Sequence, residues 1–427
     1  MRDLDANTLF EEAAKLDAAD PLKGERASFA IPKDPADNDL AYFTGNSLGL
    51  MPLSARAAVE QELDDWAKLA VDGHLNAKNP WFGYHERFRE SGARLVGAKP
   101  GEVVMMNGLT ANLHFMLASF YQPKGGRTKI VVEDALFPSD DYAVESHVQH
   151  RGLDASENII RLRPRNGEET LRTDDIIEAI KQAGDTLALV MLAGVQYRTG
   201  QWFDMPAITE AGHRAGALVG WDCAHAAGNA PLQLHDCNAD FAVWCSYKYL
   251  NSGPGAIAGC FVHERHGNNP SLPRLAGWWG NDPNTRFKME SGFVPRKGAD
   301  GWQLSNPPIL AMAPLAASLE IFDRVGMPAL REKSLKLTAF LERAVLSVAP
   351  AARIITPTDP NQRGCQLSIS FGDRAKAIRD TLQEHGVVAD FREPDVVRLA
   401  PVPLYNTFAD VARAATTIAQ STAPANA

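Results

Sequence analysis

Four short apolar runs, each followed by glycine or polar residues, constrain the fold of this chain more than any other feature. They occupy residues 129–132, 187–192, 217–221 and 241–245, and segments of helical length separate them. This alternation predicts an α/β fold, with a mostly parallel sheet and crossover helices. Sheets of this kind bind ligands at the carboxyl ends of their strands. We therefore expect the chemistry to lie in the residues that follow these runs.

Length and composition predict an enzyme of ordinary kind with more than one domain. The chain has 427 residues, of which 45% are hydrophobic and 22% charged, which is enough for a large core. We expect an N-terminal arm and helix (1–60), a large domain (61–311) and a small C-terminal α/β domain (312–427). A net charge of −9 without a block of like charges argues against nucleic acid or an anionic membrane as partner.

The cysteines and the N-terminus predict a cytoplasmic protein. The five cysteines form no C-x-x-C pair, so we expect a reducing compartment, no disulfides and no structural metal. The first residues contain neither the apolar core of a signal peptide nor a run of eighteen apolar residues.

Lys248 is the leading catalytic candidate because of its place after an apolar run. It follows residues 241–245 and precedes N-S-G-P-G, which requires a turn. The end of a strand suits an amine that loses a proton and attacks a carbonyl, although a lone lysine is more often simply exposed. Asp222 ends the run at 217–221 and stands 26 positions before Lys248. An aldehyde cofactor with a pyridine ring needs such a pair, a lysine for its aldehyde and an acid for its ring nitrogen.

The segments D-C-A-H at 222–225 and S-Y-K at 246–248 resemble the signature of fold-type I enzymes of pyridoxal 5'-phosphate (PLP), in their class V aminotransferase branch. G-N-S-L-G at 45–49, F-P-S-D at 137–140 and R-L-A-P-V-P-L-Y-N at 398–406 are similar to motifs of the kynureninase family. The resemblance implies the fold of PLP-dependent transferases. It also implies a Schiff-base role for Lys248, with Tyr247 and His225 beside the cofactor.

Further cofactor contacts follow from the resemblance. Leu109 and Thr110 open a predicted helix whose free amides suit a phosphate, though Thr110 also fits a simple helix cap. Phe137 is expected to stack on the cofactor ring, with core packing as the alternative, and Asp140 to bond its edge. The family also implies that Trp278 reaches the phosphate of a neighbouring subunit, so we expect a homodimer with shared sites.

Substrate contacts are expected from five residues, of which Arg398 is the most telling. An arginine between apolar residues needs an anion, either a substrate carboxylate, as the family implies, or a structural ion pair. Arg392 is the weaker candidate for the same role. The family places the others near the substrate or its aromatic ring, and Asn306 also near the cofactor: Asn46, His74, Ser305 and Asn306. The polar trio of His74, Ser305 and Asn306 predicts a preference for a ring with a 3-hydroxyl group.

The implied activity is hydrolysis of L-kynurenine or 3-hydroxy-L-kynurenine to anthranilate or 3-hydroxyanthranilate and L-alanine, in tryptophan breakdown or NAD synthesis. Two alternatives remain: a cysteine desulfurase or aminotransferase of the same fold, and a PLP-binding protein without catalysis. A desulfurase needs an exposed thiol, for which Cys365 is the nearby choice, yet it enters an apolar run. Ala193 stands where the family often has a hydroxyl, which puts one phosphate-side contact in doubt.

Two packing predictions complete the sequence analysis. Residues 52–71 are expected to form a helix with a buried stripe made of Ala58, Val59, Leu63, Trp66 and Leu69. The tryptophans at 278 and 279 lie between glycines, so both are expected at an interface or a ligand edge rather than in the core.

Overall fold

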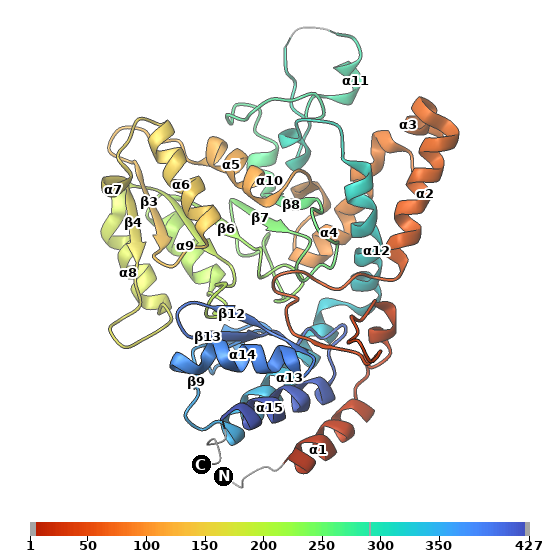
Figure 1. The fold of residues 1–427 in the computed structure, drawn as a ribbon. Helices are drawn as coiled ribbons and strands as arrows, with labels where there is room; N and C mark the ends of the chain where they lie inside the picture. The colour runs from red at the N-terminus through yellow and green to blue at the C-terminus, as the bar shows by residue number, and fades with distance from the viewer. Residues whose placement is uncertain (1–5, 290–291, 423–427) are drawn as a thin grey trace.

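The computed structural model describes residues 6–289 and 292–422. Within them a seven-stranded sheet has the order β2-β8-β7-β6-β5-β3-β4 (Figure 1). Its strands are β2 (Val103–Met105), β3 (Lys129–Glu133), β4 (Ile159–Leu162), β5 (Leu187–Ala193), β6 (Leu218–Asp222), β7 (Phe241–Cys245) and β8 (Ala258–Val262). The five neighbouring strands β7, β6, β5, β3 and β4 are parallel to one another, and β8 is antiparallel to both β7 and β2. The prediction of a mostly parallel sheet is confirmed.

Helices cover both faces of this sheet. Helices α5 (Leu109–Phe120) and α6 (Pro138–His150) lie on one face, with α8 (Thr173–Ala183) and α9 (Met205–Arg214) on the other. In β3 the side chains of Ile130 and Val132 belong to the core on the face covered by α5 and α6. The side chain of Val131 belongs to the core on the opposite face, covered by α8 and α9. Burial of both faces explains why these strands are apolar throughout.

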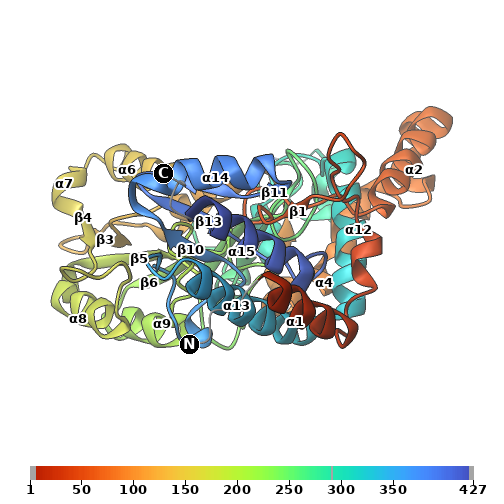
Figure 2. The same ribbon diagram turned by 60° about the horizontal axis from the view of Figure 1, so that its bottom comes forward.

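A smaller antiparallel sheet forms the C-terminal part of the fold, with the order β12-β13-β10-β9. Its strands are β9 (Arg353–Ile354), β10 (Leu367–Ser370), β12 (Asp390–Arg392) and β13 (Val396–Leu399). Helices α13 (Met327–Val348), α14 (Ala375–Glu384) and α15 (Phe408–Thr422) share its core with α1 (Ala6–Ala18), as Figure 2 shows. Residues 387–392 form two short strands, and the first, β11 (Val387–Val388), pairs with β1 (Ala41–Tyr42).

Two long helices, α2 (Ser54–Leu69) and α12 (Ile309–Val325), pack together at the right of Figure 1. The expected domain boundaries at 60/61 and 311/312 fall within them, and the domain division stays a prediction. The remaining α-helices are short: α3 (Gly73–Asn76), α4 (Arg89–Val96), α7 (Ala155–Asn158), α10 (Glu264–Gly267) and α11 (Pro283–Arg286). In the described part of the chain, no helix is both long and apolar enough to cross a membrane.

The predicted buried stripe on α2 is wrong. Trp66 is 60% exposed and Leu63 41% exposed, whereas Glu62 and Asp65 are buried. The inward face of α2 is polar because the segment that follows supplies donors to it. Trp81 Nε1 donates to Glu62 Oε2 at 3.0 Å, and the Lys78 amide donates to Asp65 Oδ2 at 3.0 Å. The apolar side of α2 therefore faces outward.

Candidate active site

The carboxyl ends of β3, β5 and β6, with the turn after β7, enclose a cavity of about 300 Å³. Helix starts at α5 and α6 complete its wall. The cavity brings together these sequence-predicted residues: Leu109, Thr110, Phe137, Asp140, Asp222, His225, Tyr247 and Lys248. Segments from four separate parts of the chain thus meet at the predicted edge of the sheet.

Lys248 sits in the wall of this cavity and is only 9% exposed. Its Nζ lies 5.6 Å from the centroid of the Phe137 ring. The turn that carries it is held by the loop at 45–49, since the Gly49 amide donates to the Tyr247 carbonyl at 2.8 Å. A side chain at Gly49 would collide with the Lys248 carbonyl oxygen and with Asn251. Only glycine therefore fits there, which explains this part of the G-N-S-L-G motif.

Three carboxyl groups face the same cavity. Asp222 ends β6, and its Oδ1 accepts a hydrogen bond from the Ala224 amide at 2.9 Å. Asp140 is fully buried, and neither of its carboxyl oxygens has a partner among the described residues. Burial, together with the charge of Asp222, raises the pKa of Asp140 well above its ordinary value. The third acid, Glu133, ends β3 and was missed, although its place after an apolar run matches that of Asp222.

Two further groups in the wall are neutral at physiological pH. Burial, and secondarily the Lys248 charge, holds the pKa of His225 well below its ordinary value. Its Nδ1 has no partner among the described atoms. Burial also raises the pKa of the Tyr247 hydroxyl. With His225 uncharged, Lys248 is the one positively charged side chain among the described residues of the cavity wall.

The cavity fits PLP in its chemistry. At one end the first amides of α5 have no partner within the helix and suit a phosphate, with Thr110 Oγ1 2.8 Å from Ser139 Oγ. The Phe137 ring is 39% exposed, so it offers a face for a planar ring. At the other end the Asp140 carboxyl receives no hydrogen bond from a described donor and Asp222 offers a carboxylate, while Lys248 supplies an amine for an aldehyde.

Arg398 and Asn46 meet beside the cavity, around the carbonyl of Tyr197. Arg398 Nη1 donates to that oxygen at 2.7 Å, and Gln366 Nε2 donates to it at 3.0 Å. Asn46 Nδ2 in turn donates to Gln366 Oε1 at 2.7 Å. The Tyr197 side chain packs edge-on to Phe137 with centroids 5.2 Å apart. Tyr197 and Gln366 were not predicted as site residues, because backbone carbonyl contacts leave no mark in a sequence.

Arg398 also has the structural partner that the sequence left open. Its Nη2 donates to Asp390 Oδ2, and Arg392 pairs with the same oxygen at 3.1 Å. Arg398 is only 1% exposed, and burial lowers its pKa to about 10, so it stays charged near neutrality. Its Nε has no partner among the described atoms, and neither has Asn46 Oδ1. One donor atom of Arg398 and one acceptor atom of Asn46 therefore remain free to bind a further group.

Besides Arg398 and Asn46, four predicted residues lie outside the cavity wall. Trp278 is 41% exposed and contacts Phe287, while Ser305 and Asn306 are both exposed. His74 stacks on Phe82, with ring centroids 4.8 Å apart. The expectation that both tryptophans avoid the core is wrong for Trp279, which is 1% exposed.

Comparisons with known proteins point to one family. A model described as the kynureninase C-terminal domain matches residues 330–418. The chain is 54% identical over 411 residues to a protein named kynureninase from Myxococcus xanthus, covering 95% of this chain and 96% of that one. It is likewise 54% identical over 418 residues to a kynureninase from Salinispora tropica, with 96% of each chain covered.

Solved structures resemble the chain in fold. A variant of C-DES with glycine covalently linked to its PLP cofactor superposes with a TM-score of 0.76 at 18% identity, covering 91% of this chain and 98% of that chain. The cysteine desulfurase CsdA of Escherichia coli gives 0.74 at 20% identity, covering 93% of this chain and 98% of that one. At such identities the likeness concerns the fold alone, which is that of PLP-dependent fold-type I proteins.

Proposed function

Because the chain belongs to the kynureninase family, we propose that it hydrolyses the Cβ–Cγ bond of L-kynurenine, of 3-hydroxy-L-kynurenine or of both. The products are anthranilate or 3-hydroxyanthranilate and L-alanine, within tryptophan breakdown or NAD synthesis. The protein is thus a PLP-dependent hydrolase of carbon–carbon bonds. The observation that carries this proposal is the enclosed cavity in which Lys248, Asp222 and Phe137 meet.

PLP, when bound, supplies an electron sink for the bonds at the substrate Cα and Cβ. The residues of this chain hold it and move protons. The Lys248 amine would hold the cofactor through its aldehyde group and would take the proton from the substrate Cα. The Asp222 carboxylate would keep a proton on the ring nitrogen, and Phe137 would support the plane of the ring. Near-complete burial keeps bulk water away, which strengthens both electrostatic contacts.

The remaining cavity residues hold the cofactor at its ends. Leu109 and Thr110 bind the phosphate through the start of α5, and Asp140 bonds the ring edge. Tyr247 and His225 act as neutral groups beside Lys248, because burial disfavours their charged forms.

Substrate recognition is proposed for Arg398 with Asn46. The unpartnered Nε of Arg398 is a buried donor that a carboxylate would satisfy. Asp390 holds the guanidinium in place in the meantime, so the ion pair and the substrate contact are compatible. The Tyr197 carbonyl fixes Arg398 next to the cavity.

The rival activities receive no comparable support. Cys365 is the candidate thiol of a desulfurase, yet it is 1% exposed and burial raises its pKa to about 12. A buried, protonated thiol is a poor nucleophile. A PLP-binding protein without catalysis would be expected to have lost Lys248 or Arg398, and this chain has both.

Reaction in water labelled with heavy oxygen tests the proposed hydrolysis. Water adds to the γ-carbonyl carbon before the Cβ–Cγ bond breaks, so one labelled oxygen enters the carboxylate of the aromatic acid and none enters alanine. Mass spectrometry of both products measures this. Products without label, or sulfide released from cysteine in place of cleavage, would contradict the proposal.

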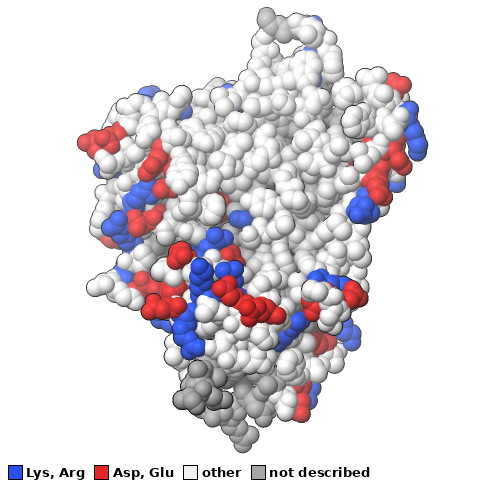
Figure 3. All heavy atoms as spheres, viewed as in Figure 1, with Lys and Arg blue, Asp and Glu red and all other residues white. Residues whose placement is uncertain are grey.

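A homodimer is proposed from the surface. The upper central part of the face seen in Figure 3 is largely free of charged residues, which gather below it and along both sides. An apolar groove of about 710 Å³ runs between α2, α12 and the loop at 48–52, and its wall includes Leu63 and Leu310, both more than 40% exposed. Exposed apolar side chains that line one groove suit an interface with another chain. A second copy of this chain is the proposed occupant, and it brings Trp278, Ser305 and Asn306 to a site that lacks them.

Mixing two inactive variants tests whether the sites are shared. Lys248→Ala and Asn306→Ala homodimers are each expected to be impaired. In a mixed population about half the dimers carry both lesions on different chains, and each of these has one intact site, so about a quarter of the wild-type activity returns. Subunits are exchanged by refolding together, and activity is measured against the unmixed variants.

Recovery identical to the sum of the separate variants would rule out sharing of Asn306. Light scattering gives the oligomeric state in the same samples. A monomer at assay concentration would remove the dimer proposal itself.

The preference for a 3-hydroxylated substrate is proposed for the trio of His74, Ser305 and Asn306. His74→Ala and Asn306→Ala are expected to lower kcat/KM for 3-hydroxykynurenine by about tenfold more than for kynurenine, through loss of a hydrogen bond to the hydroxyl. Asn361→Ala, an exposed residue of the C-terminal unit, serves as the control. An unchanged ratio of the two kcat/KM values in both variants would show that the trio does not distinguish a ring with a 3-hydroxyl group from one without it.

The cellular compartment also belongs to the proposal. All five cysteines are free and buried, which suits a reducing cytoplasm.

A further inference from the structure

We propose that Glu133 is a positioning residue of the cofactor site: it holds the end of β5 next to Asp222. It does so as an uncharged carboxyl group that carries a proton. This inference rests on the proposed cofactor site. It concerns a residue at the end of β3 that contributes to the cavity wall and is 3% exposed.

The anchoring follows from one hydrogen bond and its place in the sheet. Glu133 Oε2 accepts from the Ala193 amide at 3.1 Å. Ala193 ends β5 and stands opposite Asp222 in the parallel ladder with β6. The next amide, of Gly194, donates to the Asp222 carbonyl at 2.7 Å. Glu133 thereby ties three neighbouring strand ends, so its loss frees the backbone next to Asp222.

The uncharged form follows from the charges around the cavity. Among the described residues of its wall, Glu133, Asp140 and Asp222 are the acids and Lys248 is the one cation, since His225 is neutral. Arg398 lies beside the cavity, where Asp390 pairs with it. Three ionised acids would leave two buried negative charges without compensation, which is costly. On its other side Glu133 borders a cavity of about 180 Å³ with further acids: Asp134, Glu168 and Glu169. Each of these acids is paired with an arginine: Asp134 with Arg163 at 3.1 Å, Glu168 with Arg172, and Glu169 with Arg198 at 2.9 Å. The second cavity therefore offers Glu133 no free cation among the described residues.

The second oxygen of Glu133 fits a proton-bearing group. Oε1 has no partner among the described atoms. Burial, and secondarily the Asp222 charge, raises the pKa of Glu133 to about 8, against the pull of the Ala193 amide in the other direction. Asp222 is then left as the carboxylate that pairs with the ring nitrogen.

The sign of the pH effect can be worked out. A glutamate titrates near pH 4.3 in an unfolded chain, as an approximate reference, and at about 8 in this fold. Below both values it is neutral in either state and costs nothing. As the pH rises above the unfolded value the unfolded chain gains the ionised form first, so stability is lost progressively until about pH 8 and then levels off.

The test compares Glu133→Gln and Glu133→Leu with the wild type, with and without PLP. Gln preserves the acceptor for the Ala193 amide and never ionises. We expect Glu133→Gln to bind PLP within about threefold of the wild type and to gain thermal stability over it as the pH rises from 5 to 8. Glu133→Leu leaves the buried amide unpaired and is expected to bind PLP about tenfold more weakly.

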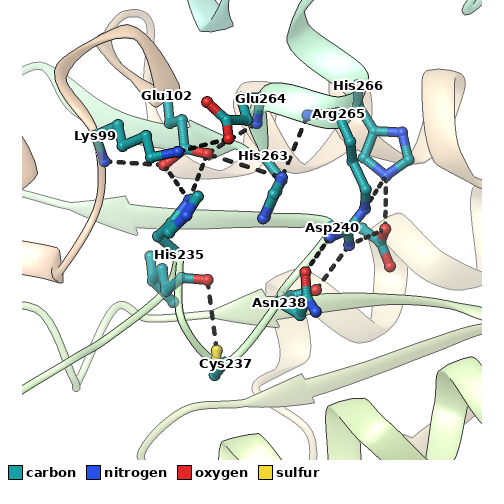
Figure 4. A network of polar contacts seen from close by, with 11 residues as sticks. Lys99, Glu102, His235, Cys237, Asn238, Asp240, His263, Glu264, Arg265 and His266 are labelled. Atoms are coloured by element: carbon teal, nitrogen blue, oxygen red, sulfur yellow. Dashed lines mark hydrogen bonds and ion pairs between the residues drawn. The ribbon is translucent and has the colours of Figure 1, made fainter.

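Glu102→Gln is the matched control, a buried glutamate in a separate polar network (Figure 4). Its carboxylate accepts from His235 at 2.9 Å and from the Glu264 and Lys99 amides, and it lies outside the cavity wall. Glu102→Gln is expected to leave PLP affinity unchanged, and any loss of stability not to follow the same pH course.

The outcomes separate this inference from the reaction itself. If Glu133→Gln binds PLP as weakly as Glu133→Leu, or if its stability runs parallel to the wild type from pH 5 to 9, the uncharged role is wrong. Should Glu133→Leu not fold, the Gln profile alone decides. The stability profile needs no substrate, so it stands or falls independently of kynurenine cleavage.

Discussion

Replacing Lys248 with alanine is expected to lower the rate of kynurenine cleavage by at least about a thousandfold. The buried amine is the one group in the cavity wall able both to bind an aldehyde and to move the Cα proton. The variant should still fold, because removal of a side chain at a cavity wall leaves the sheet core intact. Borohydride reduction followed by peptide mass spectrometry checks the covalent role, since only the wild type should retain the cofactor on the peptide with residue 248.

Lys129→Ala provides the control for this prediction. Lys129 begins β3, so it lies at the amino end of the strand, away from the carboxyl ends that line the cavity. Its loss should leave the rate and the cofactor attachment unchanged. If Lys248→Ala retained more than about a tenth of the activity, or if reduction still fixed the cofactor to another lysine, the site would have to be assigned elsewhere.

Asp222→Asn is expected to lower kcat by roughly a hundred- to a thousandfold, the scale of a lost electrostatic contact in a buried site. Asparagine keeps the acceptor for the Ala224 amide and the shape of the side chain, so the change removes charge rather than structure. Without the carboxylate the ring nitrogen loses its proton, and the cofactor withdraws electrons less strongly. Steady-state kinetics with the absorbance spectrum of the bound cofactor measure both effects.

Asp140→Asn separates charge from position in this prediction. Burial and the charge of Asp222 raise the pKa of Asp140 and so disfavour its charged form, and an amide there should cost less than about tenfold in kcat. If the two variants were equally impaired, the assignment of the ring contact to Asp222 alone would be wrong.

The sequence predicted the sheet and the cofactor cavity well for a physical reason. Strands buried on both faces are continuously apolar, and their carboxyl ends meet at one edge. A polar residue directly after such a strand is therefore a candidate for the ligand site, as with Asp222 and Lys248. The same rule applied to β3 would have indicated Glu133, which follows the apolar run at 129–132 directly.

Other features lay beyond the reach of sequence patterns. The helical spacing of Leu63 and Trp66 indicated a buried stripe, but the pattern alone does not say which partner covers it. The exposed Trp278 raises the same question, because an interface with a second chain has the composition of a core. Tyr197 positions Arg398 through a backbone carbonyl, which any residue could supply.

One measurement tests the central claim most directly. The purified protein is saturated with PLP, and L-kynurenine and then 3-hydroxy-L-kynurenine are added while absorbance and product fluorescence are followed in one cuvette. We expect a visible absorbance band of the bound cofactor, anthranilate-type fluorescence and one alanine for each aromatic acid formed. A cofactor band without product from either substrate would contradict the proposed reaction, and the absence of a band would contradict the role of Lys248.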